Sequence, residues 1–158
     1  MGLPALSHQG GLMATTAATN AALDLQEEVD RALWGLDLVR TAGGRVRARV
    51  TVGGRVELAG PVRSRLTRPQ VQATVRSVPG VVEVVDMMVA DPDVEVAVAA
   101  ALQSDPKTGG VPAGSVLVRS LFGGVTLTGR LPAGTDREAV VQVAAGVPGV
   151  QQVHDRLT

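Results

Sequence analysis

Histidine and cysteine are the side chains that most often carry catalysis or bind transition metals, and this sequence has few of them. It contains two histidines, His8 and His154, and no cysteine. A disulfide, a thiolate metal site and a cysteine nucleophile are therefore excluded. Neither histidine has partners at a metal-ligand spacing, so we expect both to be ordinary side chains and no tight transition-metal site to form.

Carboxylates and glycines give no catalytic pattern either. The acids Glu27–Glu28, Asp91 and Asp93 stand where helices are expected to begin, and the helix dipole favours carboxylates there. Gly53–Gly54 and Gly123–Gly124 join strand to strand, whereas a phosphate-binding loop joins a strand to a helix. We expect a protein that is not an enzyme and holds no cofactor.

Arginines form the best candidate for a binding site. Arg45, Arg47 and Arg49 alternate with apolar residues, and Arg55 follows on the next run. In a strand the first three would lie on one face at intervals of about 6.6 to 6.8 Å, which suits anionic groups on a lipid or polyanion surface. The alternative is an outer strand protected from aggregation by its charge.

The chain has almost no aromatic surface, since Trp34 and Phe122 are its only large aromatic side chains. Proteins that bind single-stranded nucleic acid stack bases on aromatic rings, so nucleic acid is disfavoured as a partner. Trp34 stands partly off the apolar stripe of its helix. Both aromatics are candidates for an interface, with packing at the edge of the core as the alternative for Trp34.

A tandem repeat must position these residues. The stretch Gly53–Gly60 returns as Gly123–Gly129, and Val78-Pro79-Gly80-Val81 returns as Val147-Pro148-Gly149-Val150. The offsets 129 − 60 and 147 − 78 are both 69. The repeat predicts two domains, 24–90 and 91–158, behind a flexible leader, 1–23, in which Met13 is an alternative start to Met1.

Periodicity predicts the same elements in both domains. In the first, a helix over about 25–39 precedes an alternating strand over 45–52, and a hairpin at Gly53–Gly54 leads to a second strand that ends at Gly60. A second helix and a strand over 81–89 follow, and valines on both faces of this strand favour a central or covered position. Ala42-Gly43-Gly44 is expected to end the first helix.

These elements predict an α+β fold of two tandem αββαβ units. Each would pack two helices on one face of a three-stranded mixed sheet, with the third strand parallel to the second. Four glycines are expected to be structural. Gly60 and Gly129 lie where a strand must turn toward a helix, and Gly80 and Gly149 lie past a helix end.

Each domain is small, and one of about 60 residues buries only about 60% of the surface that its unfolded chain exposes. The first has ten basic and eight acidic residues, and the second has five and seven, so their formal charges are +2 and −2. Head-to-tail attraction is one interpretation and ordinary scatter is the other. We therefore expect a homo-oligomer, with rings or filaments as possible forms.

The repeated Val-x-Leu-x-Gly motif, in Val56–Gly60 and Val125–Gly129, and the repeated Val-Pro-Gly-Val resemble the BON domain, named for bacterial osmotic-stress and nodulation proteins. The resemblance covers about 135 of the 158 residues. It implies an envelope-associated binding module that attaches to phospholipid and protects against osmotic stress. One branch of the family implies potassium binding instead.

Two features of the sequence bear on the compartment in which the protein is expected. No apolar run approaches the 18 residues that a membrane helix needs. Residues 1–22 lack the basic start and continuous apolar stretch of a signal peptide, which favours the cytoplasm. The resemblance favours the periplasm or envelope instead, with anionic phospholipid or another envelope surface as a peripheral partner.

Overall fold

The chain folds into two similar units, seen in a computed structural model that describes residues 9–41 and 45–158. The first unit consists of α1 (Gln9–Trp34), α2 (Asp37–Thr41), β1 (Arg47–Thr51), β2 (Arg55–Val62), α3 (Thr67–Arg76) and β3 (Glu83–Ala90). The second consists of α4 (Asp91–Ser104), the 3-10 turn η1 (Pro106–Thr108), β4 (Val116–Leu121), β5 (Gly124–Gly129), α5 (Arg137–Ala145) and β6 (Gln152–Leu157).

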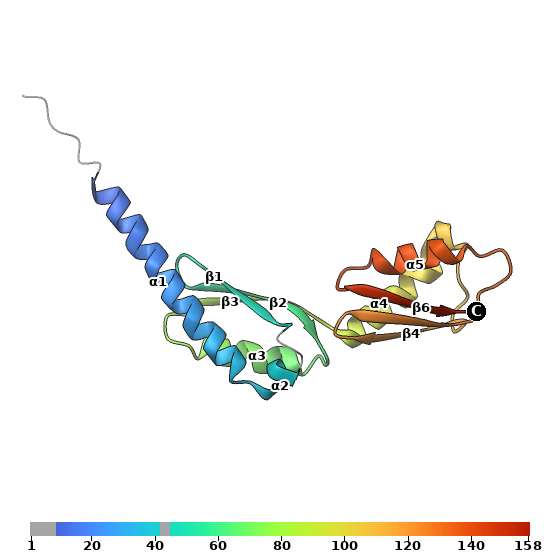
Figure 1. Cartoon of the computed structure of the whole chain (residues 1–158), viewed down its shortest axis with the longest axis horizontal. Helices are drawn as coiled ribbons and strands as arrows, with labels where there is room; N and C mark the ends of the chain where they lie inside the picture. Colours follow the sequence, from blue (N-terminus) through green and yellow to red (C-terminus); the bar gives the residue numbers. More distant parts are fainter. Residues whose placement is uncertain (1–8, 42–44) are drawn as a thin grey trace, which may run out of the picture.

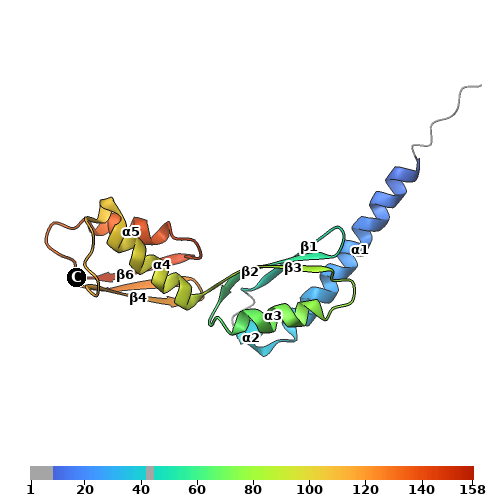
Figure 2. The ribbon, with the colours of Figure 1, turned by 180° about the vertical axis from the view of Figure 1, so that it is seen from behind.

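Each unit has one three-stranded sheet, ordered β1-β2-β3 in the first and β4-β5-β6 in the second. The first pair of strands is antiparallel and the second pair is parallel in both sheets. The long helices pack on one face of each sheet and leave the other face uncovered, and the N-terminal part of α1 projects beyond the first sheet (Figures 1 and 2). The predicted α+β fold is confirmed, including the parallel third strand.

The buried apolar residues fall into two clusters, one in each unit. The first is made of Val29, Leu33, Val39, Val46, Val56, Leu58, Val62, Val71, Val75, Val78, Met88 and Ala90. The second is made of Val94, Val98, Leu102, Val111, Val118, Val125, Leu127, Val140, Ala144, Val147 and Leu157. Each cluster joins the apolar stripes of two helices to the inner face of one sheet, so each unit has its own aliphatic core.

A side chain of the first helix also fastens that helix to the first strand in both units. Gln26 Oε1 accepts a hydrogen bond of 2.8 Å from the Val50 N–H, and Gln26 Nε2 donates one of 3.0 Å to the Ala48 carbonyl oxygen. At the matching place, Glu95 Oε1 accepts a bond of 2.8 Å from the Ser120 N–H. The repeat therefore extends to side-chain contacts.

The N-terminal region differs from the prediction. Residues 9–23, expected to belong to a flexible leader, form the beginning of α1, so Asp24, the expected start of the first domain, lies inside this helix. The helix stops at Trp34 because Gly35 and Leu36 interrupt it, and α2 continues as a separate short helix. The predicted stop at 42–44 and His8 lie outside the described residues.

Three strand predictions also need correction. β3 is an edge strand, although its valines favoured a covered position, and its outward Met87 is 50% exposed. β2 does not end at Gly60 but continues to Val62 in parallel register with β3. The second hairpin turns at Phe122 and Gly123, because Gly124 is already paired with Leu121 in the sheet.

Candidate functional site

The uncovered face of the first sheet, which we call face 1, carries most of the predicted arginines. The strand register places three rows of side chains on it. They are Arg47, Ala59 and Met87; Arg49, Glu57 and Val85; and Thr51, Arg55 and Glu83.

Two of the three arginines on face 1 are free to bind an anion. Arg55 lies between two carboxylates, with its Nη1 3.3 Å from Glu83 Oε2 and its Nε 3.9 Å from Glu57 Oε1. Arg47 and Arg49 are exposed and form no ion pair with any residue in the described ranges. Face 1 is therefore mixed in charge, with its positive end on β1.

Arg45, the fourth predicted member, lies apart from this group. It precedes β1, and its Nη1 donates a hydrogen bond of 3.2 Å to the Phe122 carbonyl oxygen in the second unit. Its guanidinium also lies 5.9 Å from the centre of the Phe122 ring, within the range of a cation–π contact. Arg45 thus connects the two units, and the structure groups only Arg47, Arg49 and Arg55.

The uncovered face of the second sheet, which we call face 2, is a second candidate that the sequence analysis missed. Its three rows are Leu117, Thr128 and Arg156; Arg119, Thr126 and His154; and Leu121, Gly124 and Gln152. None of these nine described positions is acidic. Face 2 is therefore more uniformly basic than face 1, although the second domain has the negative net charge.

The two arginines, the histidine and the leucines of face 2 are accessible. Arg119, His154 and Arg156 are exposed and have no ion-pair partner among the residues that the structure describes. Leu117 and Leu121 are 55% and 57% exposed. The repeat offers a signal for part of this face, because the first strands are offset by 70 residues and Arg119 therefore matches Arg49.

The two predicted interface aromatics have different environments. Trp34 ends α1 with 58% of its surface exposed, and it lines a small depression together with Val46 and Arg47. Phe122 instead lies beside Leu38 and Val62 of the first unit, in a depression of about 180 Å³. Phe122 is therefore part of the contact between the units, whereas Trp34 is exposed at the end of α1, on the helix-covered side of the first sheet.

The contact between the units is centred on Asp91, which is only 2% exposed. Ala90 is the N-cap of α4, so Asp91 is not the predicted cap but the first helical residue. Its carboxylate accepts hydrogen bonds from Ser120 Oγ at 2.7 Å, Phe122 N at 2.8 Å and Gly123 N at 3.0 Å. It thereby holds the hairpin between β4 and β5 at the start of α4.

Arginines of the first unit reach the same region. Arg63 Nη1 lies 3.4 Å from Asp91 Oδ2 and donates a bond of 3.2 Å to the Ser120 carbonyl oxygen. Arg65 Nη2 lies 2.6 Å from Asp93 Oδ1. Opposite charges therefore attract each other between neighbouring units within one chain. We call these contacts, with that of Arg45 and Phe122, the junction.

Phe122 is the one non-glycine residue with a positive φ, 50°, in the described part of the chain. Such a conformation costs about 1 to 2 kcal/mol for a residue with a side chain and persists only where its surroundings enforce it. Here Asp91 accepts the Phe122 N–H and Arg45 donates to its carbonyl oxygen. The junction therefore determines the shape of the hairpin turn.

One ion pair recurs on the helix-covered side of both units. Arg68 Nε donates to Asp86 Oδ2 at 2.9 Å, and Arg137 Nε donates to Asp155 Oδ2 at 2.6 Å. The hydrogen bond from Arg137, with a second from the Leu157 N–H, lowers the pKa of Asp155 below its usual value. These pairs join helix to strand inside each unit, and they have a structural role.

The lowered pKa of Asp155 predicts a dependence of stability on pH. An aspartate with a lower pKa in the folded state stabilises the protein above its unfolded pKa of about 3.9, and that contribution is lost as the pH falls through the folded pKa. Urea unfolding should therefore show Asp155→Asn to be less stable than the unmodified protein at pH 7, with the difference disappearing on acidification below about pH 4.

Asp24→Asn is the matched control, because Asp24 is exposed on α1 and forms no ion pair within the described residues. It removes the same charge without removing a bond from Arg137. An equal loss of stability in both variants at pH 7 would contradict the assignment.

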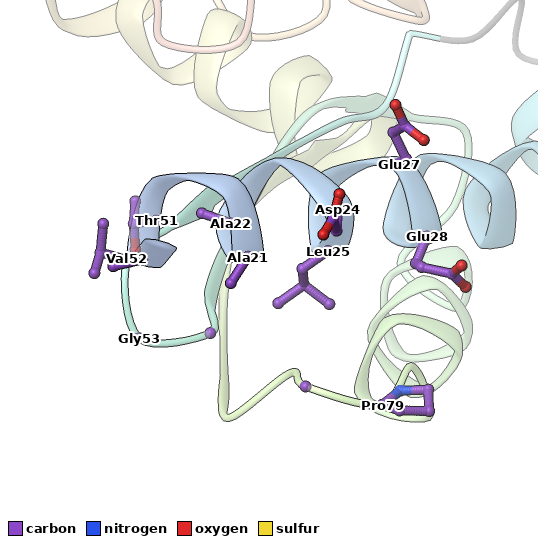
Figure 3. Close-up of a pocket in the computed structure, with 13 residues that line it drawn as sticks. Ala21, Ala22, Asp24, Leu25, Glu27, Glu28, Thr51, Val52, Gly53 and Pro79 are labelled. Atoms are coloured by element: carbon purple, nitrogen blue, oxygen red, sulfur yellow. The ribbon is translucent and has the colours of Figure 1, made fainter. Parts of the chain in front are cut away.

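An open pocket of about 660 Å³ lies between α1 and the turns that contain Gly53 and Pro79 (Figure 3). Leu25 points into this pocket, while Glu27 points away from it (Figure 3). Its lining is mostly small and apolar, with the three carboxylates Asp24, Glu27 and Glu28 on the side of α1. In the described residues, no three His, Cys, Asp or Glu side chains are grouped to hold a metal ion.

The four predicted structural glycines all have positive φ angles. They are 123° at Gly60, 96° at Gly80, 136° at Gly129 and 93° at Gly149. Gly129 is the last residue of β5, whereas Gly60 lies inside β2 and not at its end. A side chain at either position would meet the backbone just before the neighbouring strand. None of the described helices is long and apolar enough to cross a membrane.

Comparison with known proteins identifies the repeated unit. The model of the BON domain family matches residues 21–92 and again residues 90–158. Together the two matches extend over most of the chain, in the tandem arrangement expected from the sequence. No curated protein matches the chain.

Two solved structures with a similar fold are of one protein of a secretion system. One is CdsD, described as a structural protein of the type III secretion system of Chlamydia trachomatis, with a TM-score of 0.65 and 15% identity over 85% of this chain. A structure of the CdsD C-terminal domain has a TM-score of 0.58 and 15% identity over 84% of this chain. The chain spans about three fifths of each, 61% and 62%, and the likeness shows the fold alone.

Proposed function

The chain belongs to the BON domain family, with two domains in tandem, and on that premise we propose that it is a non-catalytic module that attaches to the surface of anionic phospholipid through its uncovered sheet faces. Attachment would be peripheral, at a cell envelope. The observation that carries the proposal is face 2, on which Arg119, Arg156 and His154 are exposed without an acidic neighbour on the face.

Electrostatics and burial both favour a lipid partner for face 2. Each basic residue near an anionic membrane contributes about 1 kcal/mol, so Arg119 and Arg156 supply about 2 kcal/mol at low salt. Leu117 and Leu121 are more than half exposed beside them and could bury apolar surface at the lipid interface. The combination of cations with leucines favours a lipid surface over a soluble polyanion.

Face 1 supplies a weaker site of the same kind. Arg47 and Arg49 are free, but Glu57 and Glu83 on the same face reduce its positive potential. We therefore propose that face 2 is the main attachment surface and face 1 a separate, weaker one.

Sedimentation with phospholipid vesicles tests the proposal. The full chain should sediment with vesicles of phosphatidylglycerol at low salt, but not with vesicles of phosphatidylcholine. The double variant Arg119→Gln/Arg156→Gln should bind about 30-fold more weakly, because it loses about 2 kcal/mol of attraction. Raising the salt to about 1 M should abolish binding, since the Debye length falls to about 3 Å.

Arg31→Gln/Arg76→Gln is the matched control, because both arginines are exposed on helices. This variant has the same net charge as Arg119→Gln/Arg156→Gln. It should bind like the unmodified chain. Equal weakening by the two variants would show that net charge and not face 2 governs binding, and no binding to anionic vesicles would contradict the proposal.

The alternative, self-assembly into filaments, has less support. Filaments could form if the junction repeated between chains, and the similar CdsD is described as a structural protein. For that, the first unit of one chain would have to offer the second unit of another chain the residues that Asp91 and Phe122 supply in the junction. In the repeat, Ala22 corresponds to Asp91 and Val52 corresponds to Phe122, so these residues are missing from the described first unit. Oligomers would need another surface, such as the open edges of the sheets.

A further inference from the structure

The two uncovered sheet faces point in opposite directions. In Figure 1 the helices α2 and α3 lie below the first sheet, whereas α4 and α5 lie above the second. Figure 2 shows the same opposition from behind. Face 1 is therefore directed upward and face 2 downward in these views, and one flat surface cannot contact both faces of the same chain.

The junction holds this arrangement without a flexible linker. β3 ends at Ala90 and α4 begins at Asp91, so no residue separates the two units. Arg63 bonds both Asp91 and the Ser120 carbonyl oxygen, which ties the first unit to the helix and to the hairpin of the second. The aromatic ring of Phe122 lies against the first unit and beneath Arg45.

Both faces carry cations without partners, although they differ in strength. Arg47 and Arg49 on face 1 and Arg119 and Arg156 on face 2 form no ion pair within the described residues. Each face also has exposed apolar side chains, Met87 on face 1 and Leu117 and Leu121 on face 2. A chain attached through face 2 would therefore present face 1 to the solution.

We propose that the chain bridges two anionic bilayers, with face 2 on one and face 1 on the other. This inference rests on the proposed attachment to phospholipid and adds a second membrane as the partner of face 1. The fixed junction is essential to it, because a flexible connection would allow both faces to turn toward the same bilayer.

The test uses two populations of phosphatidylglycerol vesicles, one labelled with a donor dye and the other with an acceptor dye, mixed with the full chain at low salt. Energy transfer should rise as the chain joins vesicles of the two populations. It should fall again at a large excess of protein, because each vesicle is then covered by separate chains and few free surfaces remain to be joined.

The double variant Arg47→Gln/Arg49→Gln separates bridging from attachment. It should still sediment with the vesicles through face 2 but should lose the energy transfer. Arg31→Gln/Arg76→Gln, with the same net charge, should keep both properties. Sedimentation of the unmodified chain without energy transfer would overturn the bridging inference alone.

Energy transfer that persists in Arg47→Gln/Arg49→Gln would also overturn bridging, because the vesicles would then be joined by association of chains through another surface. If the unmodified chain neither sediments with the vesicles nor joins them, the proposed attachment fails and the bridging inference fails with it.

Discussion

Replacing Asp91 with alanine is expected to lower the free energy of unfolding by about 3 kcal/mol or more. The carboxylate is buried, and its removal leaves the Ser120 hydroxyl and the N–H groups of Phe122 and Gly123 without their acceptor. A buried donor left without a partner costs about 1 to 3 kcal/mol. Phe122 would also lose a bond that holds its unfavourable backbone angle.

Asp93→Ala is the matched control for Asp91→Ala, because Asp93 lies in the same first turn of α4 but has one ion pair, with the exposed Arg65. Exposed pairs contribute about 0 to 1 kcal/mol. Urea unfolding followed by circular dichroism should give similar free energies of unfolding for the unmodified chain and Asp93→Ala, and a much lower one for Asp91→Ala. Similar midpoints for the two variants would mean that Asp91 does not organise the junction.

The second large effect is expected at Gly129, where alanine should lower the free energy of unfolding by more than about 3 kcal/mol. A Cβ atom there would lie 2.1 Å from the Ser115 carbonyl oxygen, and the φ angle is 136°. Gly60 has the same geometry, 2.2 Å from the Arg45 carbonyl oxygen with φ 123°. Neither strand can accept a side chain without moving the backbone.

Gly134→Ala separates two effects that are combined at Gly129, the close approach of a Cβ atom to the backbone and the strain of a positive φ angle. Gly134 has a φ of 86°, but a Cβ atom there would meet nothing within 4 Å. Its substitution should therefore cost only about 1 to 2 kcal/mol, the strain of the angle itself. Thermal unfolding of the two variants measures the difference. Equal melting temperatures would show that the close approach to Ser115 does not matter.

The repeat made the fold predictable. Two copies of one pattern at a fixed offset indicate one structure used twice, and the valines that alternate in each copy are those that reach the cores, such as Val56 and Val125. Periodicity could not place β3, however. Valines on both faces suit a covered strand, but strand order is set by the crossover through α3, which puts β3 at an edge.

The site was less predictable, because alternation describes a side chain relative to its own strand only. Arg45 continues the pattern of Arg47 and Arg49, but it precedes β1 and contacts Phe122 in the other unit. Asp91 has the sequence of a helix cap, and its role depends on a hairpin 29 to 32 residues further on. Contacts between units cannot be inferred from local spacing.

Face 2 was not predicted from the sequence for a related reason. Its two arginines come from separate strands, Arg119 from β4 and Arg156 from β6, and no single stretch of sequence is basic. Only the pairing of both strands with β5 brings these residues onto one face.

The most direct test of the account is to ask which surface meets the lipid. The chain has no cysteine, so a single one can be introduced and labelled with a polarity-sensitive dye. Thr126→Cys places the dye in the centre of face 2, between Arg119 and His154, and Gln142→Cys places it on the exposed side of α5. With phosphatidylglycerol vesicles, the emission of the first dye should shift to the blue and that of the second should stay unchanged. A shift at Gln142→Cys with none at Thr126→Cys would contradict attachment through the sheet.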